Sequence, residues 1–276
     1  MKPQIVFQGE PGAYSELAAF EYFGSGISPL PCASFEDAFA AVADGTARYG
    51  LLPIENSLAG SIHRNYDLLL ESDLSIVGEY HLRVSHCLMA LPGTTLSDVH
   101  QVHSHPQALA QCKHRLRQMG VEAIVEADTA GSARMIKERG DTTAAALASK
   151  RAADVYQLQI LQESMEDNPA NYTRFLALTA QTTQEHTKGD FKTSIVFSLQ
   201  NQPGALFKAL SVFALRDIDL TKIESRPIQG KPWEYMFYID FAGHADSQSG
   251  RRALDHLEEL AAYLRVLGSY PRHRIV

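Results

Sequence analysis

The sequence predicts an α/β protein with two lobes followed by a small ferredoxin-like domain, and three observations lead to this expectation. Short apolar runs alternate with helical patterns between residues 5 and 178, which is typical of a largely parallel sheet covered by helices. Two extended runs, 74–77 and 86–91, interrupt this alternation and are expected to cross into a second lobe. From residue 192 onward the predicted order of elements becomes βαββαβ, the ferredoxin-like plan.

The first lobe is predicted from apolar runs that are bounded by cap and turn residues. Ser34 stands before an apolar-periodic segment as an N-cap, Asp37 is its approximate capping-box partner, and Gly45 follows the helix. In chain order, the expected elements are a strand at 5–7, helices at 14–23 and 35–42, a strand at 49–54 and a helix at 62–70.

The second lobe repeats this α/β order. Pro106 suits the first position of a helix, Gly120 its end, and Thr129 the cap of the next helix. Strands are expected at 99–103, 121–125, 144–148 and 158–161, and helices at 106–119, 130–138 and 150–156. A strand at 174–178 then returns to the first lobe, and a cleft between two such lobes is a common place for a ligand.

The C-terminal part begins after a segment without hydrophobic periodicity, 180–190, which predicts a linker. Thr193 starts a run in which apolar and polar residues alternate, as in a half-buried strand. The remaining elements are expected as helices with apolar faces at 206–214 and 254–264, and as strands at 220–224, 235–241 and 266–270.

Composition and charge restrict the classes of function. The chain has 276 residues, of which 45% are hydrophobic and 21% charged, as in ordinary globular proteins. Its 25 basic and 32 acidic side chains give a formal net charge of −7, so binding to nucleic acid is not expected. An anionic small substrate must therefore be attracted by local cations and backbone N–H groups.

The cysteines and the N-terminal residues indicate a cytoplasmic protein without a metal site. Cys32, Cys87 and Cys112 are odd in number and no pair has metal-ligand spacing, so we expect buried or inert thiols in a reducing compartment. The N-terminus leads directly into a strand without a segment suited to a signal peptide, and no later segment is expected to span a membrane.

Two strings connect the chain with a known family. Residues 171–178, Asn-Tyr-Thr-Arg-Phe-Leu-Ala-Leu, follow Tyr156 and Asp167 at set intervals, and together they resemble the signature of prephenate dehydratases. Residues 222–227, Lys-Ile-Glu-Ser-Arg-Pro, resemble the hallmark of the ACT regulatory domain in that family. Two independent strings in the right order are far harder to meet by chance than one.

This resemblance implies a fold, an activity and a mode of regulation. The expected fold is a two-lobed, periplasmic-binding-protein-like catalytic domain followed by a ferredoxin-like ACT domain. The expected enzyme is a monofunctional carbon–oxygen lyase that converts prephenate to phenylpyruvate without a cofactor. L-Phenylalanine is expected to inhibit it at the ACT domain of a homodimer or homotetramer. The expected bounds are 1–180 for the catalytic domain, with lobes at 1–76 plus 162–180 and at 77–161, then 181–191 for the linker and 192–276 for the ACT domain.

The reaction indicates which side chains are needed. Loss of CO2 and of the hydroxyl makes the ring of prephenate aromatic, so the difficult step is the expulsion of hydroxide near neutral pH. A group that donates a proton or a strong hydrogen bond to that oxygen contributes a rate factor on the order of 10²–10⁴. Two carboxylates must also be bound, and no metal is required.

Thr173 is the residue that the resemblance implicates in catalysis, because its hydroxyl can donate one hydrogen bond to the departing oxygen while it accepts others. Arg174 either clamps a carboxylate in bidentate fashion or pairs with Glu55 or Asp167 and holds the threonine in place. Phe175 either packs in the core or stacks on the substrate ring. Glu55 is a rival proton source, provided that burial keeps it protonated.

Further substrate contacts are expected at strand ends and helix starts, where N–H groups can face an anion. The predicted substrate-binding residues are Gly12, Ser15, Asn56, Ser57, Ser61, Ser104, Gln111 and Phe175. Ser104 is followed by His105, but adjacent residues cannot readily form a nucleophile–base pair. Because no GxSxG elbow occurs either, a hydrolase is not expected.

The phenylalanine site is expected where a strand ends and a helix begins in the ACT domain. Gly204 permits a close approach of the backbone, the helix N-terminus favours a carboxylate, and Glu224 on the neighbouring strand can receive the ammonium. The resemblance assigns to this site Asn201, Pro203, Gly204, Ala205, Leu206, Phe207, Glu224, Ser225 and Arg226.

Two alternatives remain open from the sequence. Arogenate carries an ammonium in place of the keto group of prephenate, and no residue decides between these two substrates. A non-catalytic amino-acid sensor would combine a two-lobed solute-binding portion with a small sensing domain, but such a protein needs no hydroxyl at Thr173.

Overall fold

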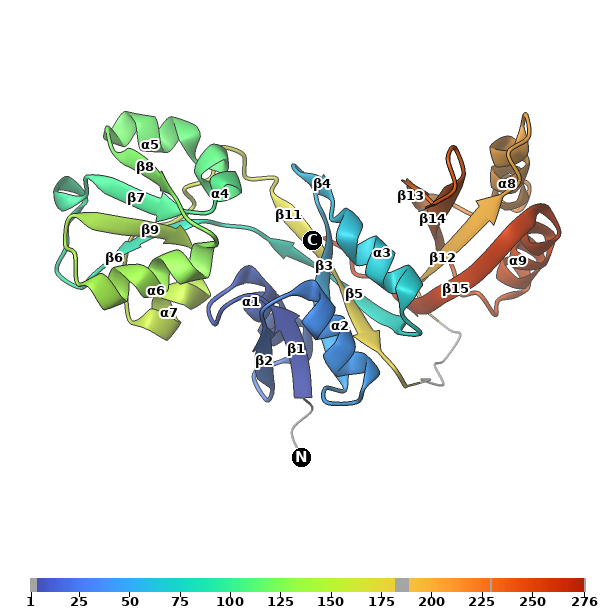
Figure 1. Cartoon of the computed structure of the whole chain (residues 1–276), viewed down its shortest axis with the longest axis horizontal. Coiled ribbons are helices and arrows are strands. Elements are labelled where there is room, and N and C mark those ends of the chain that lie inside the picture. The colour runs from blue at the N-terminus through green and yellow to red at the C-terminus, as the bar shows by residue number, and fades with distance from the viewer. Residues whose placement is uncertain (1–3, 182–188, 229, 276) are drawn as a thin grey trace. The chain divides into compact units, whose positions relative to one another are not determined.

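The computed structural model describes residues 4–181, 189–228 and 230–275. The chain separates into two compact units, of which one comprises residues 1–62 and 81–175 and the other residues 63–80 and 176–276 (Figure 1). Residues 182–188, which form most of the predicted linker at 181–191, lie outside the described residues. In the described part of the chain, no helix is long and apolar enough to cross a membrane.

The first sheet has the strand order β2-β1-β3-β11-β5, with β4 paired to β3. Its strands are β1 (Gln4–Gln8), β2 (Ser28–Cys32), β3 (Tyr49–Asn56), β4 (Gly60–Ser61), β5 (Ser75–Arg83) and β11 (Tyr172–Thr179). As the alternation predicts, β1 is parallel to both β2 and β3, and α1 (Tyr14–Phe23) and α2 (Phe35–Ala43) connect them. Both halves of the capping box predicted at Ser34 and Asp37 are present, which explains where α2 begins.

The second sheet belongs to the first unit and has the order β10-β6-β9-β7-β8. Its strands are β6 (Cys87–Ala90), β7 (Gln101–Ser104), β8 (Glu122–Val125), β9 (Ala144–Ala148) and β10 (Gln159–Gln162). β7 is parallel to β8 and β9, whereas β6 is antiparallel to β9 and β10. The chain therefore leaves the first sheet after β5 and returns to it in β11, which confirms the two-lobed topology.

The helices around the second sheet differ from the prediction at two places. They are η1 (Leu96–Asp98), α4 (Pro106–Gln111), α5 (Lys113–Met119), α6 (Thr129–Arg139) and α7 (Lys150–Tyr156). The single helix predicted at 106–119 is interrupted at Cys112, whose N–H reaches the carbonyls of both Ala108 and Leu109. The cap of α6 is Asp128, whose carboxylate accepts the N–H of Gly131, and not the predicted Thr129, which is already helical.

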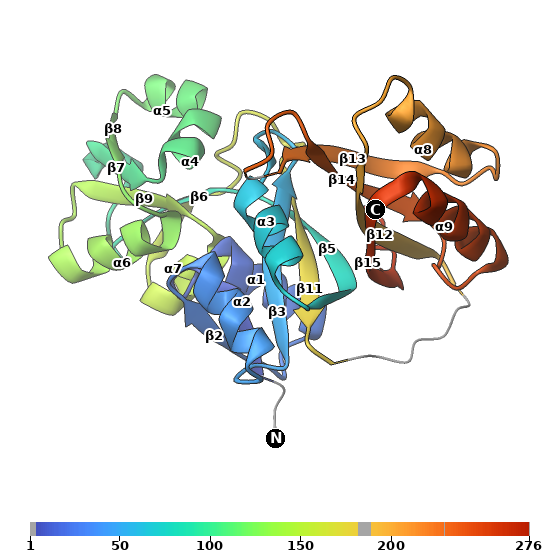
Figure 2. The same ribbon diagram turned by 45° about the vertical axis from the view of Figure 1, so that its right-hand side comes forward.

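The second unit contains a four-stranded antiparallel sheet with the order β13-β14-β12-β15. Its elements are β12 (Phe191–Leu199), α8 (Ala205–Ala214), β13 (Leu220–Pro227), β14 (Tyr235–Ala242), α9 (Gln248–Leu260) and β15 (Ala261–Pro271), which confirms the βαββαβ order. One face of this sheet packs against α8 and α9 (Figure 2) through buried side chains that include Phe197, Phe213, Phe241 and Leu257.

The other face of this sheet carries α3 (His63–Glu71) and the start of β5, which belong to the same unit. The Tyr238 hydroxyl donates to the carbonyl of Tyr66 at 2.9 Å, and the Arg265 guanidinium donates to the carbonyls of Leu69 and Leu74 at 3.4 and 3.2 Å. α3 therefore forms close to its predicted range, but it belongs to the same compact unit as the βαββαβ sheet. The predicted domain boundary at residue 180 follows chain order instead, and it remains a proposal.

Gly268 is required where β15 passes the start of β5. A Cβ at this position would collide with the backbone of Ile76, above all with its carbonyl oxygen. Gly268→Ala is therefore expected to lower the free energy of unfolding by about 1–3 kcal/mol, because two packed strands must separate to admit the methyl group. Urea unfolding measures this loss, with Gly26→Ala as the control because its Cβ would meet nothing within 4 Å. Equal effects of the two substitutions would contradict the close approach.

Candidate active site

A cavity of about 310 Å³ lies in the first unit and is lined by residues from the elements of both sheets. This size suits a small organic ligand. Its polar lining residues are Tyr14, Ser15, Asn56, Ser61, His86, His105, Gln107, Gln111, Thr129 and Thr173, and its apolar lining includes Pro53, Ile62, Val84 and Phe175.

Thr173 lies in this cavity with its hydroxyl oxygen held by Asn56. The Asn56 Nδ2 group donates to Thr173 Oγ1 at 3.0 Å and to Asn171 Oδ1 at 2.8 Å. The Asn56 Oδ1 atom accepts the backbone N–H groups of Leu58 and Ala59, both at 3.0 Å, which fixes the orientation of the amide. An amide nitrogen accepts no hydrogen bond, so the proton of the Thr173 hydroxyl remains available to a ligand.

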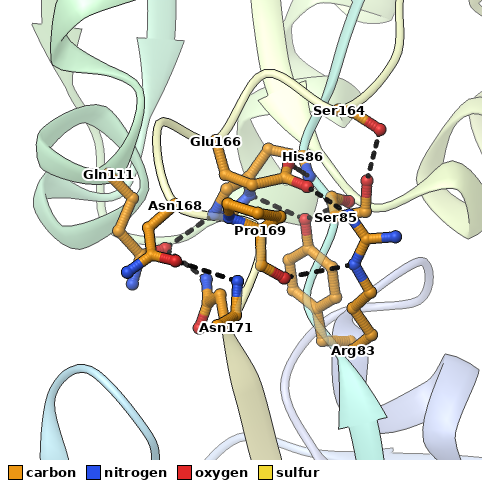
Figure 3. A network of polar contacts seen from close by, with 11 residues as sticks. Arg83, Ser85, His86, Gln111, Ser164, Glu166, Asn168, Pro169 and Asn171 are labelled. Carbon is orange, nitrogen blue, oxygen red and sulfur yellow. Dashed lines mark hydrogen bonds and ion pairs between the residues drawn. The ribbon is translucent and has the colours of Figure 1, made fainter.

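His86 is the centre of a second group of polar contacts (Figure 3). Its Nε2 atom lies 2.8 Å from Gln111 Oε1, and its Nδ1 atom lies 2.7 Å from the Tyr14 hydroxyl. Its backbone N–H donates to Glu166 at 2.9 Å, and Glu166 also faces Arg83 at 3.4 Å. Burial lowers the pKa of His86, which keeps the imidazole neutral near pH 7.

Three helices begin at the cavity wall. They are α1, which contributes Tyr14 and Ser15, α4, which contributes Ala108, and α6, which contributes Thr129. Ala13 precedes α1 and offers no side-chain cap, which leaves N–H groups of the first turn available to an anion. No lysine or arginine occurs among the described residues that line the cavity. Of the three helix N-termini, that of α1 is therefore the one best suited to a carboxylate, since side chains of His105 and Asp128 cap α4 and α6.

The structure brings six of the predicted substrate and catalytic residues together in this cavity. They are Ser15, Asn56, Ser61, Gln111, Thr173 and Phe175. The other five, Gly12, Glu55, Ser57, Ser104 and Arg174, are not in its lining.

Three of these five have structural contacts that explain why the sequence carries them. The Gly12 N–H donates to Glu16 at 2.7 Å, and a Cβ on Gly12 would lie 2.8 Å from the backbone of Ala152. The Ser104 hydroxyl is fully buried and donates to the Leu147 carbonyl. Ser57 likewise joins β3 to the chain before β11, because its hydroxyl donates to the Ala170 carbonyl and accepts the N–H of Tyr172.

The side chain of Arg174 lies on the face of β11 that is turned away from the cavity. Thr173 and Phe175 both line the cavity, so the side chain between them points to the opposite face of the strand. Arg174 is only 8% exposed there. Of the two roles expected for it, this placement favours holding the strand over clamping a carboxylate.

Tyr14, His86 and Asn171 also belong to the site: the sequence suggests His86, beside Ser85, as a possible lining residue, but it assigns no contact to Tyr14 or Asn171. Asn171 is fully buried and donates from Nδ2 to Gln111 Oε1 at 2.9 Å. Asn171 opens the string 171–178, and Tyr14 precedes the predicted contact Ser15. Their side chains meet only in the fold, so spacing along the chain carries no signal for them.

The cysteine thiols are not suited to nucleophilic chemistry. Cys87 and Cys112 are buried, and Cys32 is partly buried. Burial raises the pKa of Cys87 to about 11 and raises that of Cys112 further, so both remain protonated near pH 7. Among the described residues, no group of three histidine, cysteine or acidic side chains could hold a metal ion.

A smaller cavity of about 130 Å³ in the second unit lies where the phenylalanine site is expected. Asn201, Ala205 and Leu206 line it together with side chains of β14 such as Phe237. Pro203, Gly204, Phe207, Glu224, Ser225 and Arg226 are not in its lining. Gly204 has a φ of 78°, a left-handed conformation that suits glycine at the start of α8.

Two of the residues expected at the phenylalanine site face α3 instead. The Arg226 guanidinium contacts the Asp67 carboxylate at 3.2 and 2.9 Å, and Glu224 lies 3.4 Å from His63. Ser225 lies between them on the strand and is exposed on the other face.

Comparisons with known proteins match both parts of the chain. The family model of prephenate dehydratase matches residues 5–183, and that of the ACT domain matches residues 193–259. Arogenate dehydratase/prephenate dehydratase 1, chloroplastic, of Arabidopsis thaliana is 47% identical over 284 residues, covering 98% of this chain and 72% of that protein.

Two solved structures cover nearly the whole chain. GqqA, described as a novel type of quorum quenching acylase, has a TM-score of 0.92 and 40% identity over 98% of both chains. The prephenate dehydratase of Arthrobacter aurescens in complex with L-Phe has a TM-score of 0.90 and 31% identity over 98% of this chain and 90% of that one.

Proposed function

Since this chain belongs to the prephenate dehydratase family and carries an ACT domain, we propose that it converts prephenate to phenylpyruvate. The observation that carries this proposal is the hydroxyl of Thr173. Its oxygen accepts from Asn56, and among the described residues no acceptor takes its proton. That proton faces a cavity of the right size for a six-membered ring.

In the proposed reaction the ring loses its carboxylate as CO2, and the electrons of that bond complete the aromatic system. The hydroxyl on the far side of the ring leaves with its bonding pair, takes up one proton and departs as water. Thr173 is not an acid near neutral pH, so its role is to donate a hydrogen bond to the oxygen as negative charge develops there. The N-terminus of α1, which has no side-chain cap, receives a carboxylate.

The choice between prephenate and arogenate depends on a single substituent, a keto group or an ammonium. The Arabidopsis relative is named for both substrates. The cavity lining contains no carboxylate among the described residues, which favours the keto acid because an ammonium would lack an ionic partner. Parallel measurement of kcat/KM on both compounds tests this choice. Phenylpyruvate is detected in one assay and phenylalanine in the other, and a higher value for arogenate would overturn it.

We further propose that L-phenylalanine inhibits the enzyme at the ACT domain and that the protein is a homodimer or homotetramer in the cytoplasm. Support comes from the Arthrobacter aurescens enzyme, whose structure contains L-Phe. In this chain, the cavity beside Asn201 and Leu206 is small, and six of the nine residues expected at the site are not in its lining. A second copy would complete it. Light scattering with and without L-phenylalanine, next to inhibition curves, tests both parts.

Hydrolysis of an acyl amide is a second activity to test, because GqqA is described as an acylase. Such a reaction needs a base that activates water or a hydroxyl. Both ring nitrogens of His86 are engaged, and Nδ1 of His105 accepts the N–H of Gln107 at 3.2 Å. The described contacts therefore favour dehydration. Release of an amine from an N-acyl amide at a rate comparable to prephenate turnover would instead support hydrolysis.

A further inference from the structure

The amide side chains around the cavity form a chain of hydrogen bonds whose direction is fixed at one end. The backbone N–H groups of Leu58 and Ala59 can only donate, so the atom of Asn56 that they meet is its oxygen. The NH2 group of Asn56 therefore points to Asn171, and the atom of Asn171 that receives it is an oxygen.

The direction of these hydrogen bonds is also fixed at Gln111. Since Asn171 uses its oxygen toward Asn56, its NH2 group is the end that meets Gln111, at 2.9 Å. An NH2 group needs an acceptor, so Gln111 presents Oε1 to it. This oxygen is also the atom that lies 2.8 Å from Nε2 of His86.

The direction then determines the tautomer of His86. Nε2 faces a carbonyl oxygen and must carry a proton. Because the buried ring is neutral, Nδ1 has a lone pair, which accepts from the Tyr14 hydroxyl at 2.7 Å.

We propose that Asn171 is a positioning residue. Through Gln111 it holds the proton of His86 on Nε2, and it turns the NH2 group of Gln111 away from Asn171 and His86. Among the described residues, that NH2 group has no recorded acceptor, and Gln111 lines the cavity. The result is a cavity in which Gln111 and Thr173 both offer donors. Two donors suit an anionic substrate with a departing oxygen. Only this match to the substrate, with its kinetic test, rests on the proposed function.

Asn171→Asp tests the proposal by changing one atom. The new carboxylate accepts where the amide donated, so Gln111 must turn its NH2 group toward this carboxylate and toward His86. His86 must then move its proton to Nδ1, and the Tyr14 hydroxyl must donate to the Ser85 carbonyl, which lies 3.1 Å away. Nitrogen-15 NMR of labelled histidine near pH 7, with His86 assigned by its absence in His86→Gln, distinguishes the two tautomers.

We expect wild-type His86 to be protonated on Nε2 alone, and His86 in the Asn171→Asp variant to be protonated on Nδ1 alone. The other titratable groups near His86 and Tyr14 are Glu166 with its partner Arg83, Cys87 and Cys112, and none of them is altered. A wild-type protein with its proton on Nδ1 overturns the proposal. An Asn171→Asp variant in which His86 stays protonated on Nε2, either as the neutral ring or as the imidazolium, also overturns the proposal.

Two variants serve as controls for the added charge. Asn168→Asp makes the same change on an exposed residue whose Oδ1 accepts the Ala170 N–H, and it should leave His86 unchanged. Gln111→Glu brings a carboxylate into direct contact with His86 but still offers it an oxygen, so Nε2 should stay protonated. A loss of the Nε2 proton in either control would assign the effect to charge and overturn the proposal.

The kinetic readout follows from the reversed Gln111, which would present its oxygen to the cavity. With prephenate, KM of Asn171→Asp should rise by a factor on the order of 10 or more, with a smaller change in kcat. An unchanged KM together with a moved proton overturns the claim about cavity polarity. Inactivity of the wild-type protein toward prephenate would instead count against the proposed function, because the NMR result does not depend on it.

Discussion

Replacing Thr173 by alanine is expected to lower kcat for prephenate by a factor on the order of 10²–10⁴, while the fold remains intact. The hydroxyl is the donor best placed in the cavity, since Asn56 holds its oxygen and leaves its proton for the substrate. The loss should fall on kcat rather than KM. The negative charge that this donor stabilises develops only as the oxygen departs, so the interaction is strongest in the transition state.

Two further substitutions at this position separate the hydroxyl from the packing. Thr173→Ser keeps an oxygen within reach of Asn56 and should retain most of the activity. Thr173→Val keeps the volume and removes the hydroxyl, so it should behave like Thr173→Ala. Thermal unfolding of all three variants measures whether the fold is preserved. A Thr173→Val enzyme with nearly normal kcat would remove the threonine from the proposed mechanism.

Helices with strong local signals could be predicted from the sequence, whereas a helix shaped by a distant segment could not. α1 and α7 have the predicted bounds, and the capping box of α2 follows from Ser34 and Asp37. The interruption at Cys112 has a different origin. The Asp167 N–H donates to the Gln111 carbonyl at 2.7 Å, and its carboxylate accepts the N–H of His114 at 3.0 Å. One residue from far along the chain thus ends α4 and begins α5.

Local signals and long-range contacts likewise determine different features of the candidate active site. Thr173 stands in the string 171–178 that resembles a family, whereas Asn56 and Gln111 are expected contacts from other segments, and the structure brings all three to one cavity. Which face each neighbour uses depends on strand pleat and on packing partners, so Arg174 and Ser104 lie outside the lining although Thr173 and His105, their neighbours in the chain, are part of it. A string of residues predicts which segments meet, and the fold decides which side chains within them reach the substrate.

The expected phenylalanine site shows why the predicted ACT domain, 192–276, differs from the compact second unit, which also contains residues 63–80. The strand that carries Glu224 and Arg226 faces α3, a helix far earlier in the sequence but part of the same unit. The Arg226–Asp67 pair is partly exposed and therefore contributes about 0–1 kcal/mol to stability. The proposed inhibition by L-phenylalanine gives this pair a test, because a rearrangement of β13 would change a contact of α3, the helix that follows Ser61 in the chain.

Lys192→Met is expected to lower the free energy of unfolding by about 3–5 kcal/mol, a larger loss than any surface ion pair of this protein would give. Lys192 of β12 and Glu79 of β5 lie 2.8 Å apart, and their side chains are 7% and 0% exposed. Glu79 also accepts the N–H of His273 at 3.1 Å. Loss of the ammonium removes the cation that contacts this buried carboxylate at 2.8 Å, and urea unfolding of the whole chain reports the difference.

A double substitution distinguishes the cost of the buried charge of Glu79 from the value of the pair. Lys192→Met with Glu79→Leu removes both charges, so much of the loss should be recovered if the cost of Lys192→Met comes from the buried carboxylate that remains. Arg64→Met is the matched control at an exposed pair, because Arg64 and Glu71 are 43% and 54% exposed, and it should cost less than about 1 kcal/mol. If Lys192→Met costs no more than this control, water must reach Glu79, and α3 and β5 would then cover the sheet less tightly than their contacts indicate.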